Sequence, residues 1–215
     1  TMKDVARAAG VSEMAASSAL TGGRRGSVRV SAETRERVLA EAQRLGYLPN
    51  ASARALKTQR TNALGFVTDM IGGEPNFYFL EVFSGVMQGA AGAGQTTSVF
   101  ALGSWDEAPA RIPALGDGRV DGLILLAPLL RDDGAAWLPR RTPVVSVQAD
   151  RPLVGVVNIE SDNEAGARAM VRQLLAIGHR RILHLGGPPG ISLADRRVEG
   201  YLRAHAEAGV KPARD

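Results

Sequence analysis

From residue 64 onward, short apolar runs alternate with longer segments of helical periodicity. The apolar runs predict strands at residues 64–67, 99–102, 122–126, 144–147, 156–159 and 181–186. The segments between and after them predict helices at residues 80–93, 109–115, 163–177 and 197–208. Continuous apolar strands separated by helices are typical of parallel sheets that are covered on both faces. The pattern therefore predicts an α/β fold with parallel sheets in two consecutive units, divided near residue 160.

The first 48 residues lack this alternation and predict an all-α domain of three short helices. These helices are expected at residues 2–9, 13–20 and 32–45. Thr1 and Asp4 have the spacing of a capping box, and Ser12 and Ser31 stand where they can cap the next two helices. Gly10 supplies the positive φ that a tight helix C-terminus favours. Two short helices joined by such a turn form a helix-turn-helix, which in many proteins binds DNA, although helix–glycine–helix alone is common.

Charge is distributed unevenly along the 215 residues. Residues 1–60 contain 11 Lys and Arg against 5 Asp and Glu, a net charge of +6, whereas residues 61–215 contain 15 against 17. A basic loop at residues 21–30 carries Arg24, Arg25 and Arg29. Because DNA binding depends on neutralising phosphates, this excess favours a polyanionic partner for the first segment.

Composition and motifs exclude several other classes. The chain has no cysteine, which rules out disulfides, thiolate metal sites and cysteine nucleophiles. No apolar run approaches the ~18 residues that span a bilayer, and the first residues lack a signal-peptide core, so we expect a soluble, cytoplasmic protein without a membrane partner. No dinucleotide fingerprint, metalloprotease motif or nucleophile elbow is present, and we expect neither enzymatic activity nor a cofactor or metal.

Several segments resemble the LacI–GalR family of bacterial transcription regulators. They are KDVARAAGVS (residues 3–12), VSAETRERVLAEAQRLGYLPNASARALK (30–57), the following ALGFV, RVDGLIL (119–125), DNEAGARAMVRQLLAIGHRRILHLGG (162–187) and RRVEGYLRAHAEAG (196–209). The resemblance implies a helix-turn-helix domain at residues 1–48, a hinge helix and linker at 49–62, and a periplasmic-binding-protein-like effector domain at 63–215. Members usually continue well past this length, so we expect an incomplete effector domain.

The resemblance also implies a function. Members are regulators, typically repressors, that bind a double-stranded DNA operator as homodimers and respond to a small effector such as a sugar. In the family, the segment that matches residues 51–56 becomes a helix when two chains meet on the operator. Its leucine, here Leu56 between Arg54 and Lys57, wedges into the minor groove at the central base step. A flexible linker with an incidental leucine is the alternative interpretation.

The candidate DNA contacts follow from the helix and charge pattern together with the family resemblance. Ser18 departs from the family, since members often carry a base-reading arginine there, and the second helix has no Arg, Lys, Asn or Gln for a bidentate base contact. We therefore expect weaker or shifted direct readout, and more dependence on the hinge and on DNA shape. A sugar-binding module with little sequence-specific DNA binding is the alternative. The expected contacts are Thr1, Lys3, Ser12, Glu13, Met14, Ser17, Ser18, Arg24, Arg25, Arg29, Tyr47, Asn50, Ser52, Ala53, Arg54, Leu56 and Lys57.

Effector-binding residues are expected where the predicted strands end, because parallel sheets bind ligands beyond the carboxyl ends of their strands. Aromatic rings beside carboxylates and amides suit a polyhydroxylated ring, and the resemblance adds Arg197, three residues before Gly200. The expected set is Asp69, Asn76, Phe77, Phe79, Asp150, Asp162 and Arg197. Alternatives are a core position for Phe79, a helix N-cap for Asp162 and a turn before a strand for Asp121, a further candidate.

Overall fold

The computed structural model describes residues 1–21, 28–69, 77–132, 134, 136–187 and 190–212, apart from the side chains of Lys57 and Tyr78. The chain divides into two compact units, Thr1–Gln59 and Arg60–Asp215. Among the expected site residues, Arg24, Arg25, Asn76 and the side chain of Lys57 lie outside the described residues. No helix within the described ranges is long and apolar enough to cross a membrane.

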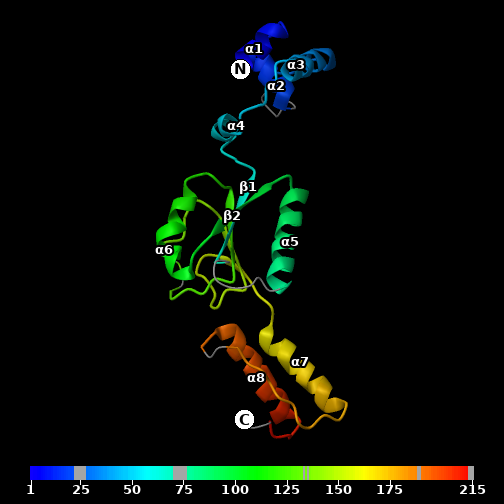
Figure 1. Ribbon diagram of the computed structural model, residues 1–215, viewed down its shortest axis with the longest axis vertical. Helices are drawn as coiled ribbons and strands as arrows, with labels where there is room; N and C mark the ends of the chain where they lie inside the picture. Colours follow the sequence, from blue (N-terminus) through cyan, green and yellow to red (C-terminus); the bar gives the residue numbers. More distant parts are fainter. Residues whose placement is uncertain (22–27, 70–76, 133, 135, 188–189, 213–215) are drawn as a thin grey trace. The chain divides into compact units, whose positions relative to one another are not determined.

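The first unit contains helices α1 (Met2–Ala8), α2 (Glu13–Thr21), α3 (Ala32–Arg44) and α4 (Ala51–Thr58) (Figure 1). The expected capping box of Thr1 and Asp4 is present, and the Ser31 hydroxyl caps α3 by accepting from the Thr34 N–H at 3.1 Å. Val5, Ala16 and Val38 are fully buried where α1, α2 and α3 meet. Small apolar residues at these positions let the three helices approach closely.

The second unit is built on one parallel sheet. Its strands are β1 (Ala63–Thr68), β2 (Thr96–Ala101), β3 (Gly122–Leu126), β4 (Val144–Val147) and β5 (Val157–Ile159), in the order β2-β1-β3-β4-β5. Helix α5 (Phe77–Gly92) covers one face, and the short α6 (Ala108–Arg111) lies on the other (Figure 1). Two 3-10 turns, at Trp105–Glu107 and Pro113–Gly116, flank α6.

Neighbouring residues of β1 show how the two faces are filled. Phe66 is fully buried and packs against the Phe83 ring of α5, with ring centroids 4.9 Å apart. Val67 belongs to the cluster that includes Ile112 and Trp105 beside α6. Successive side chains of a strand point to opposite faces, so a run that is apolar at every position is needed when both faces are covered.

Helices α7 (Asn163–Ala176) and α8 (Ser192–Glu207) pack closely against each other. A Cβ at Gly200 of α8 would lie 2.2 Å from the carbonyl oxygen of Glu164 in α7. Ion pairs flank this contact, from Arg203 to Glu164 at 2.8 Å and from Arg168 to Glu207 at 2.6 Å. Glycine is required at this crossing because the two backbones come too close for any side chain.

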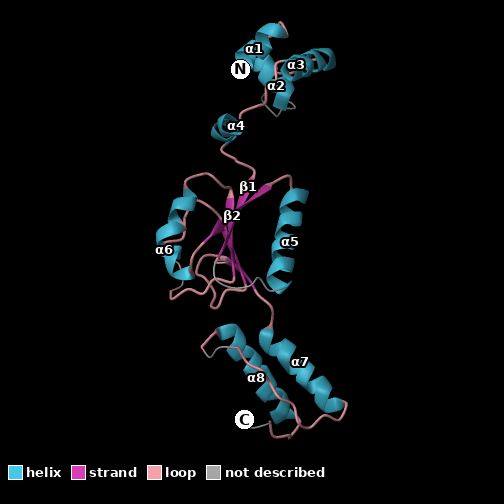
Figure 2. Cartoon of the chain, in the orientation of Figure 1, coloured by secondary structure: helices cyan, strands magenta, loops and turns pink. Residues whose placement is uncertain are grey.

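The strand expected at residues 181–186 is absent, and this prediction was wrong (Figure 2). A strand exists through hydrogen bonds to a neighbouring strand, and no described segment pairs with this one. Its inward side packs on α8 instead, where the Tyr201 hydroxyl donates to the Ile182 carbonyl oxygen at 2.9 Å. Leu183 and Leu185 are 64% and 87% exposed. The apolar pattern was correct, but it could not show whether a partner strand is present.

Candidate functional site

Helix α2 presents few polar groups on its exposed surface. Ser12 directly precedes the helix, and its hydroxyl accepts from the Ala15 N–H at 3.2 Å. Glu13 is exposed, Met14 is 66% exposed and Ser17 is half-buried. Glu13 and Met14 lie in the first turn of the helix, which is the part that reaches base edges when a recognition helix enters the major groove, and Ser17 lies at its middle.

Ser18 faces the interior instead. Its side chain is only 4% exposed, and its hydroxyl donates a hydrogen bond to the carbonyl oxygen of Val28. This placement contradicts the expected direct contact of Ser18 with DNA, because the single hydroxyl hydrogen is already used and the group is buried. Sequence reasoning could not find the bond, because its partner is separated from Ser18 by the loop that follows α2.

The other expected DNA contacts lie mostly at the surface. Tyr47 is the exception, since it packs partly against the core of the first unit. The Thr1 hydroxyl donates to the Asp4 carboxylate at 2.6 Å. The exposed members are Thr1, Lys3, Arg29, Asn50, Ser52, Ala53, Arg54 and Leu56.

Helix α4 is short and carries an uncovered apolar side chain. Asn50 caps it, with Oδ1 accepting from the N–H groups of Ser52 at 2.8 Å and Ala53 at 3.1 Å. Gln59 ends it in the left-handed conformation, with φ of 53°. Leu56 is 86% exposed. Isolated helices of fewer than about 12 residues are marginal in water, so the cap by Asn50 matters for the stability of this 8-residue helix.

Asp121 joins the residues after α4 to the sheet. Its Oδ1 accepts from the Thr61 N–H at 2.7 Å and the Thr61 hydroxyl at 2.9 Å, and its Oδ2 accepts from the Asn62 N–H at 2.9 Å. Burial by itself would raise the pKa of Asp121, but the hydrogen bonds from Thr61 and Asn62 and the charge of Arg60 lower it overall. Asp121 is therefore an anchor for the start of β1, in keeping with the turn alternative.

Replacing this carboxylate checks the anchoring role. Asp121→Asn is expected to lower the free energy of unfolding by about 1 kcal/mol near pH 7, because hydrogen bonds to a charged acceptor are replaced by weaker ones. The folded pKa lies below the ordinary value of 3.8, so this stabilisation is complete above that value and is lost as the pH falls through the folded pKa. Urea unfolding of both proteins from about pH 7 to about pH 3 measures it. A difference that stays constant over this range would contradict the prediction.

Two buried polar atoms at the carboxyl ends of β1 and β4 have no hydrogen-bond partner among the described residues, Thr68 Oγ1 and Gln148 Oε1. Their side chains are 0% and 9% exposed. Strand β3 lies between β1 and β4, and with neighbouring strands about 4.8 Å apart the carboxyl ends of β1 and β4 are roughly 10 Å apart across the sheet. An unpaired buried group costs about 1–3 kcal/mol, so a ligand that offers hydroxyl groups suits this edge.

Neither Thr68 nor Gln148 was among the expected effector contacts. The available signal was that Gln148 follows the apolar run of residues 144–147 directly, at the position where ligand contacts of a parallel sheet begin. Its backbone also has a φ of 54°, which residues other than glycine seldom adopt. The sequence could not show this conformation.

Three of the expected effector residues meet near the first turns of α7 and α8, and all three already bind protein groups. Asp162 is the N-cap of α7, as the alternative interpretation held. The hydrogen bonds run from the Ser192 N–H to Asp150 Oδ1 at 2.6 Å, from the Ala165 N–H to Asp162 Oδ1 at 2.9 Å and from Arg197 Nε to Asn163 Oδ1 at 2.9 Å. Gln148 reaches the same region, because its Nε2 donates to the Ser161 hydroxyl at 2.6 Å.

The remaining expected effector residues are placed differently. The Phe79 ring packs edge-on against Phe66, with centroids 6.4 Å apart, which matches the core alternative. Phe77 is 88% exposed at the start of α5. Asp69 is half-buried and directly follows Thr68 at the end of β1. The structure thus brings Asp69 to the edge that carries the unpaired Thr68 hydroxyl, whereas Phe79 is half-buried and packs on Phe66.

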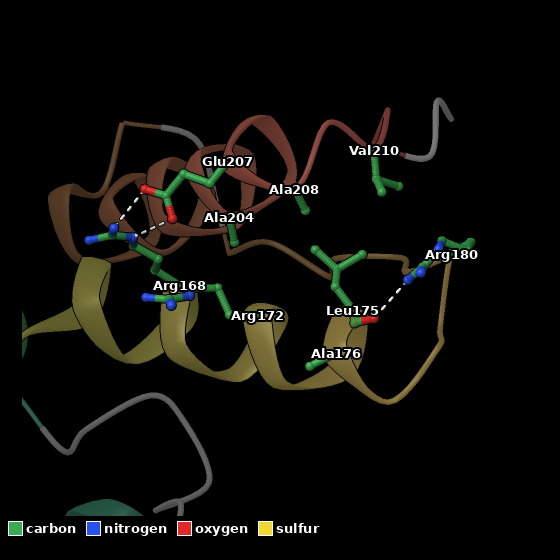
Figure 3. A pocket seen from close by; sticks show the side chains of 9 residues that line it. All are labelled: Arg168, Arg172, Leu175, Ala176, Arg180, Ala204, Glu207, Ala208 and Val210. Atoms are coloured by element: carbon green, nitrogen blue, oxygen red, sulfur yellow. Dashed lines mark hydrogen bonds and ion pairs between the residues drawn. The ribbon is translucent and has the colours of Figure 1, made fainter.

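A separate cavity of about 420 Å³ opens between α7 and α8 (Figure 3). Leu175 and Ala204 line it, and arginines stand at both ends. Two of the guanidinium groups are already engaged, Arg168 with Glu207 at 2.6 Å and Arg180 with the Leu175 carbonyl oxygen at 2.7 Å. None of the expected effector residues that the structure describes lines this cavity. It is a consequence of how the two helices pack, distinct from the edge of the sheet.

Two family models match consecutive parts of the chain. Residues 1–50 match the model described as bacterial regulatory proteins of the lacI family. Residues 61–215 match the model of periplasmic binding proteins and the sugar-binding domain of the LacI family. Residues 51–60, which contain α4, lie between the two matched segments.

Individual relatives agree with these models. The HTH-type transcriptional regulator CelR of Thermobifida fusca is 32% identical over 98% of this chain and 62% of its own length, and GalR of Escherichia coli is 34% identical over 98% and 60%. A lac repressor dimer bound to operator and an anti-inducer has a TM-score of 0.79 at 27% identity, covering 99% of this chain and 63% of that one. A CelR–cellobiose complex has a TM-score of 0.56 at 28% identity, with 98% and 62% covered. The chain spans less than two thirds of the length of these relatives.

Proposed function

The chain belongs to the LacI family of bacterial regulatory proteins, and from this premise we propose that it is a transcription regulator, a repressor, that binds operator DNA under the control of a small effector such as a sugar. The observation that carries the proposal is Leu56, which is 86% exposed on the capped helix α4. An apolar side chain without cover on a short helix suits insertion into a minor-groove base step, where extra contacts on the bent duplex offset the cost of unstacking.

Operator reading is divided between two elements. Met14 and Glu13 on α2 are suited to the thymine methyl group and the cytosine amino group in the major groove. Neither makes the bidentate contact that an arginine or glutamine makes, so we propose that Leu56 and the deformability of the central base step supply much of the selectivity.

A second copy of the chain fits the outer surface of α5. Only one of the 16 residues of this helix, Glu81, is charged. Phe77, Leu80 and Met87 are 88%, 42% and 45% exposed, and Val99 of the edge strand β2 is 49% exposed. Exposed apolar patches of this kind mark protein–protein contacts. We propose that this surface pairs two chains, so that two α2 helices and two Leu56 side chains serve one near-palindromic operator.

The effector is proposed to bind at the carboxyl ends of the strands. Thr68 and Gln148 offer unpaired polar atoms there, and Asp69 adds a carboxylate. A neutral polyhydroxylated ring supplies the hydroxyl donors that the Gln148 oxygen and the Asp69 carboxylate accept. Effector binding would then change how the strand ends hold α7 and α8, and so release the operator. The cellobiose complex of CelR supports a sugar as the class of effector.

Selection of bound duplexes from a random pool tests the DNA-binding part. We expect enrichment of a two-fold symmetric site with a flexible pyrimidine–purine step at its centre, because dimers read half-sites related by symmetry and such steps kink easily. Salt-sensitive binding without any enriched sequence would overturn the proposal of a sequence-specific regulator. It would favour the alternative of a sugar-binding module with little sequence-specific DNA binding.

Substitution of Gln148 tests the effector site. Gln148→Ala is expected to weaken the response of the operator complex to a neutral sugar about tenfold, because a buried ligand hydroxyl loses its acceptor. Operator affinity without sugar should stay within about twofold of the original value. Operator release is measured against a panel of neutral mono- and disaccharides that includes cellobiose. Gln173→Ala, an exposed position on α7, is the matched control. An unchanged response in Gln148→Ala would place the site elsewhere.

A further inference from the structure

The burial of Ser18 raises the question of what this residue does for DNA binding. Its hydroxyl points to the interior of the first unit and holds the Val28 carbonyl oxygen. This bond joins the second half of α2 to the end of the loop that follows it. Ser18 therefore fixes backbone that lies outside its own helix, at the position where the family often has an arginine that contacts DNA.

The residues after the loop are held at two points with one free side chain between them. The Val28 carbonyl is held by Ser18, and Val30 packs against the core formed by α1, α2 and α3. Arg29 stands between these anchors and is exposed. Its guanidinium makes no hydrogen bond or ion pair with any residue in the described part of the chain. Because the backbone on both sides is already fixed, little further ordering is required when this guanidinium binds a partner.

The position of Arg29 favours a contact with phosphate over a contact with a base. The first half of α2, with Glu13 and Met14, is the part suited to the groove. Arg29 directly follows Val28, which is bound to the second half of α2 through Ser18, so Arg29 is tied to the part of α2 away from Glu13 and Met14. Arginine binds phosphate through charge-assisted, often bidentate hydrogen bonds. Contacts of this kind set the register of the protein on the duplex.

We propose that Ser18 is a positioning residue that acts through Arg29, and that the Ser18–Val28 bond holds Arg29 as a phosphate contact that sets the register of α2 on the operator. The inference rests on the proposed function. It also gives the serine at position 18 a role. Where the family often has a base-reading arginine, Ser18 holds the backbone next to Arg29, which contacts phosphate.

A double-mutant cycle on the duplex selected above tests the coupling. Arg29→Ala is expected to weaken binding about tenfold for all sequences and to reduce the slope of log affinity against log salt by about 0.9. Ser18→Ala should weaken binding about fivefold, and Ser18→Thr, which keeps the hydroxyl, should restore most of the loss. In the Arg29→Ala background, Ser18→Ala should change the affinity by less than about twofold, because Ser18 acts through Arg29.

The control is Arg172→Ala, which removes an equal charge from the exposed surface of α7 and should leave both affinity and salt slope unchanged. Circular dichroism confirms that each variant keeps the helical content of the original chain. Effects of Ser18→Ala and Arg29→Ala that multiply in the double variant would overturn the coupling, and an unchanged salt slope in Arg29→Ala would overturn the phosphate contact. Failure of the unmodified chain to select any duplex would instead overturn the proposed function, and the cycle distinguishes the two results.

Discussion

Replacement of Leu56 by alanine is expected to lower operator affinity by about 30- to 100-fold. Burying a leucine side chain contributes about 2 kcal/mol, and part of the energy of bending the duplex is recovered only when a wedge holds the base step open. A total of about 2.1–2.8 kcal/mol corresponds to this range of affinities. Gel mobility shift measures the loss, and circularly permuted duplexes measure the bend, which should become smaller.

Leu48 provides the matched control for this substitution. It is a leucine of the segment before α4 and is 84% exposed, almost as much as Leu56. Leu48→Ala should change the affinity by less than about threefold, because the family resemblance assigns no wedge to this position. Equal losses in the two variants would indicate general contact of the linker with DNA. An unchanged bend in Leu56→Ala, with affinity retained, would show that Leu56 does not enter the duplex.

Gly200→Ala is expected to destabilise the second unit by about 3 kcal/mol, at the upper end of the cost of overpacking. The added Cβ would lie 2.2 Å from the Glu164 carbonyl oxygen and 3.0 Å from the Ala167 Cβ, so backbone rather than a flexible side chain has to move. The ion pair of Arg203 with Glu164 would stretch as the helices separate. Urea unfolding followed by circular dichroism measures the change as a lower transition midpoint.

Gly166 of α7 is the comparison for this substitution, because a Cβ there meets nothing within 4 Å. Gly166→Ala should stabilise the protein by about 0.5–1 kcal/mol, as alanine does when it replaces glycine in an unobstructed helix interior. The two substitutions therefore have opposite expected signs on the same pair of helices. A Gly200→Ala variant that is as stable as the original chain, or stabilised like Gly166→Ala, would show that the crossing at Gly200 is looser than described.

Local sequence signals predicted the fold where they act over a few residues. The capping box of Thr1 and Asp4, the cap at Ser31 and the strands β3 and β4 all lie where spacing and apolar runs place them. The strand predicted at residues 181–186 is absent because a strand needs a partner strand, and the presence of a partner cannot be recognised from the local sequence. Helix α8 begins at Ser192, ahead of the expected residue 197, because Asp150 from the end of β4 accepts the Ser192 N–H.

Site residues were harder to predict for the same physical reason. The exposed Met14 and Leu56 could be placed from helix geometry and family resemblance, since exposure is the default for residues outside an apolar stripe. The burial of Ser18 depends on Val28, and the free oxygen of Gln148 depends on the unusual backbone conformation of that residue. Non-local contacts decide which polar group is engaged and which is available, and neither composition nor periodicity records them.

The anchoring of Thr61 by Asp121 fixes the first end of β1, and the strand carries a polar group at its other end. Its first end is clamped to the start of the neighbouring strand β3, directly after the segment that carries Leu56. Its last residue, Thr68, holds the unpaired hydroxyl at the opposite edge of the sheet. Six residues at about 3.3 Å each span roughly 20 Å, and hydrogen bonds to β2 and β3 keep them from stretching. If the proposed sugar displaces Thr68, the hydrogen-bonded strands β2, β1 and β3 would have to move together, and the displacement would reach Thr61 at the other end of β1.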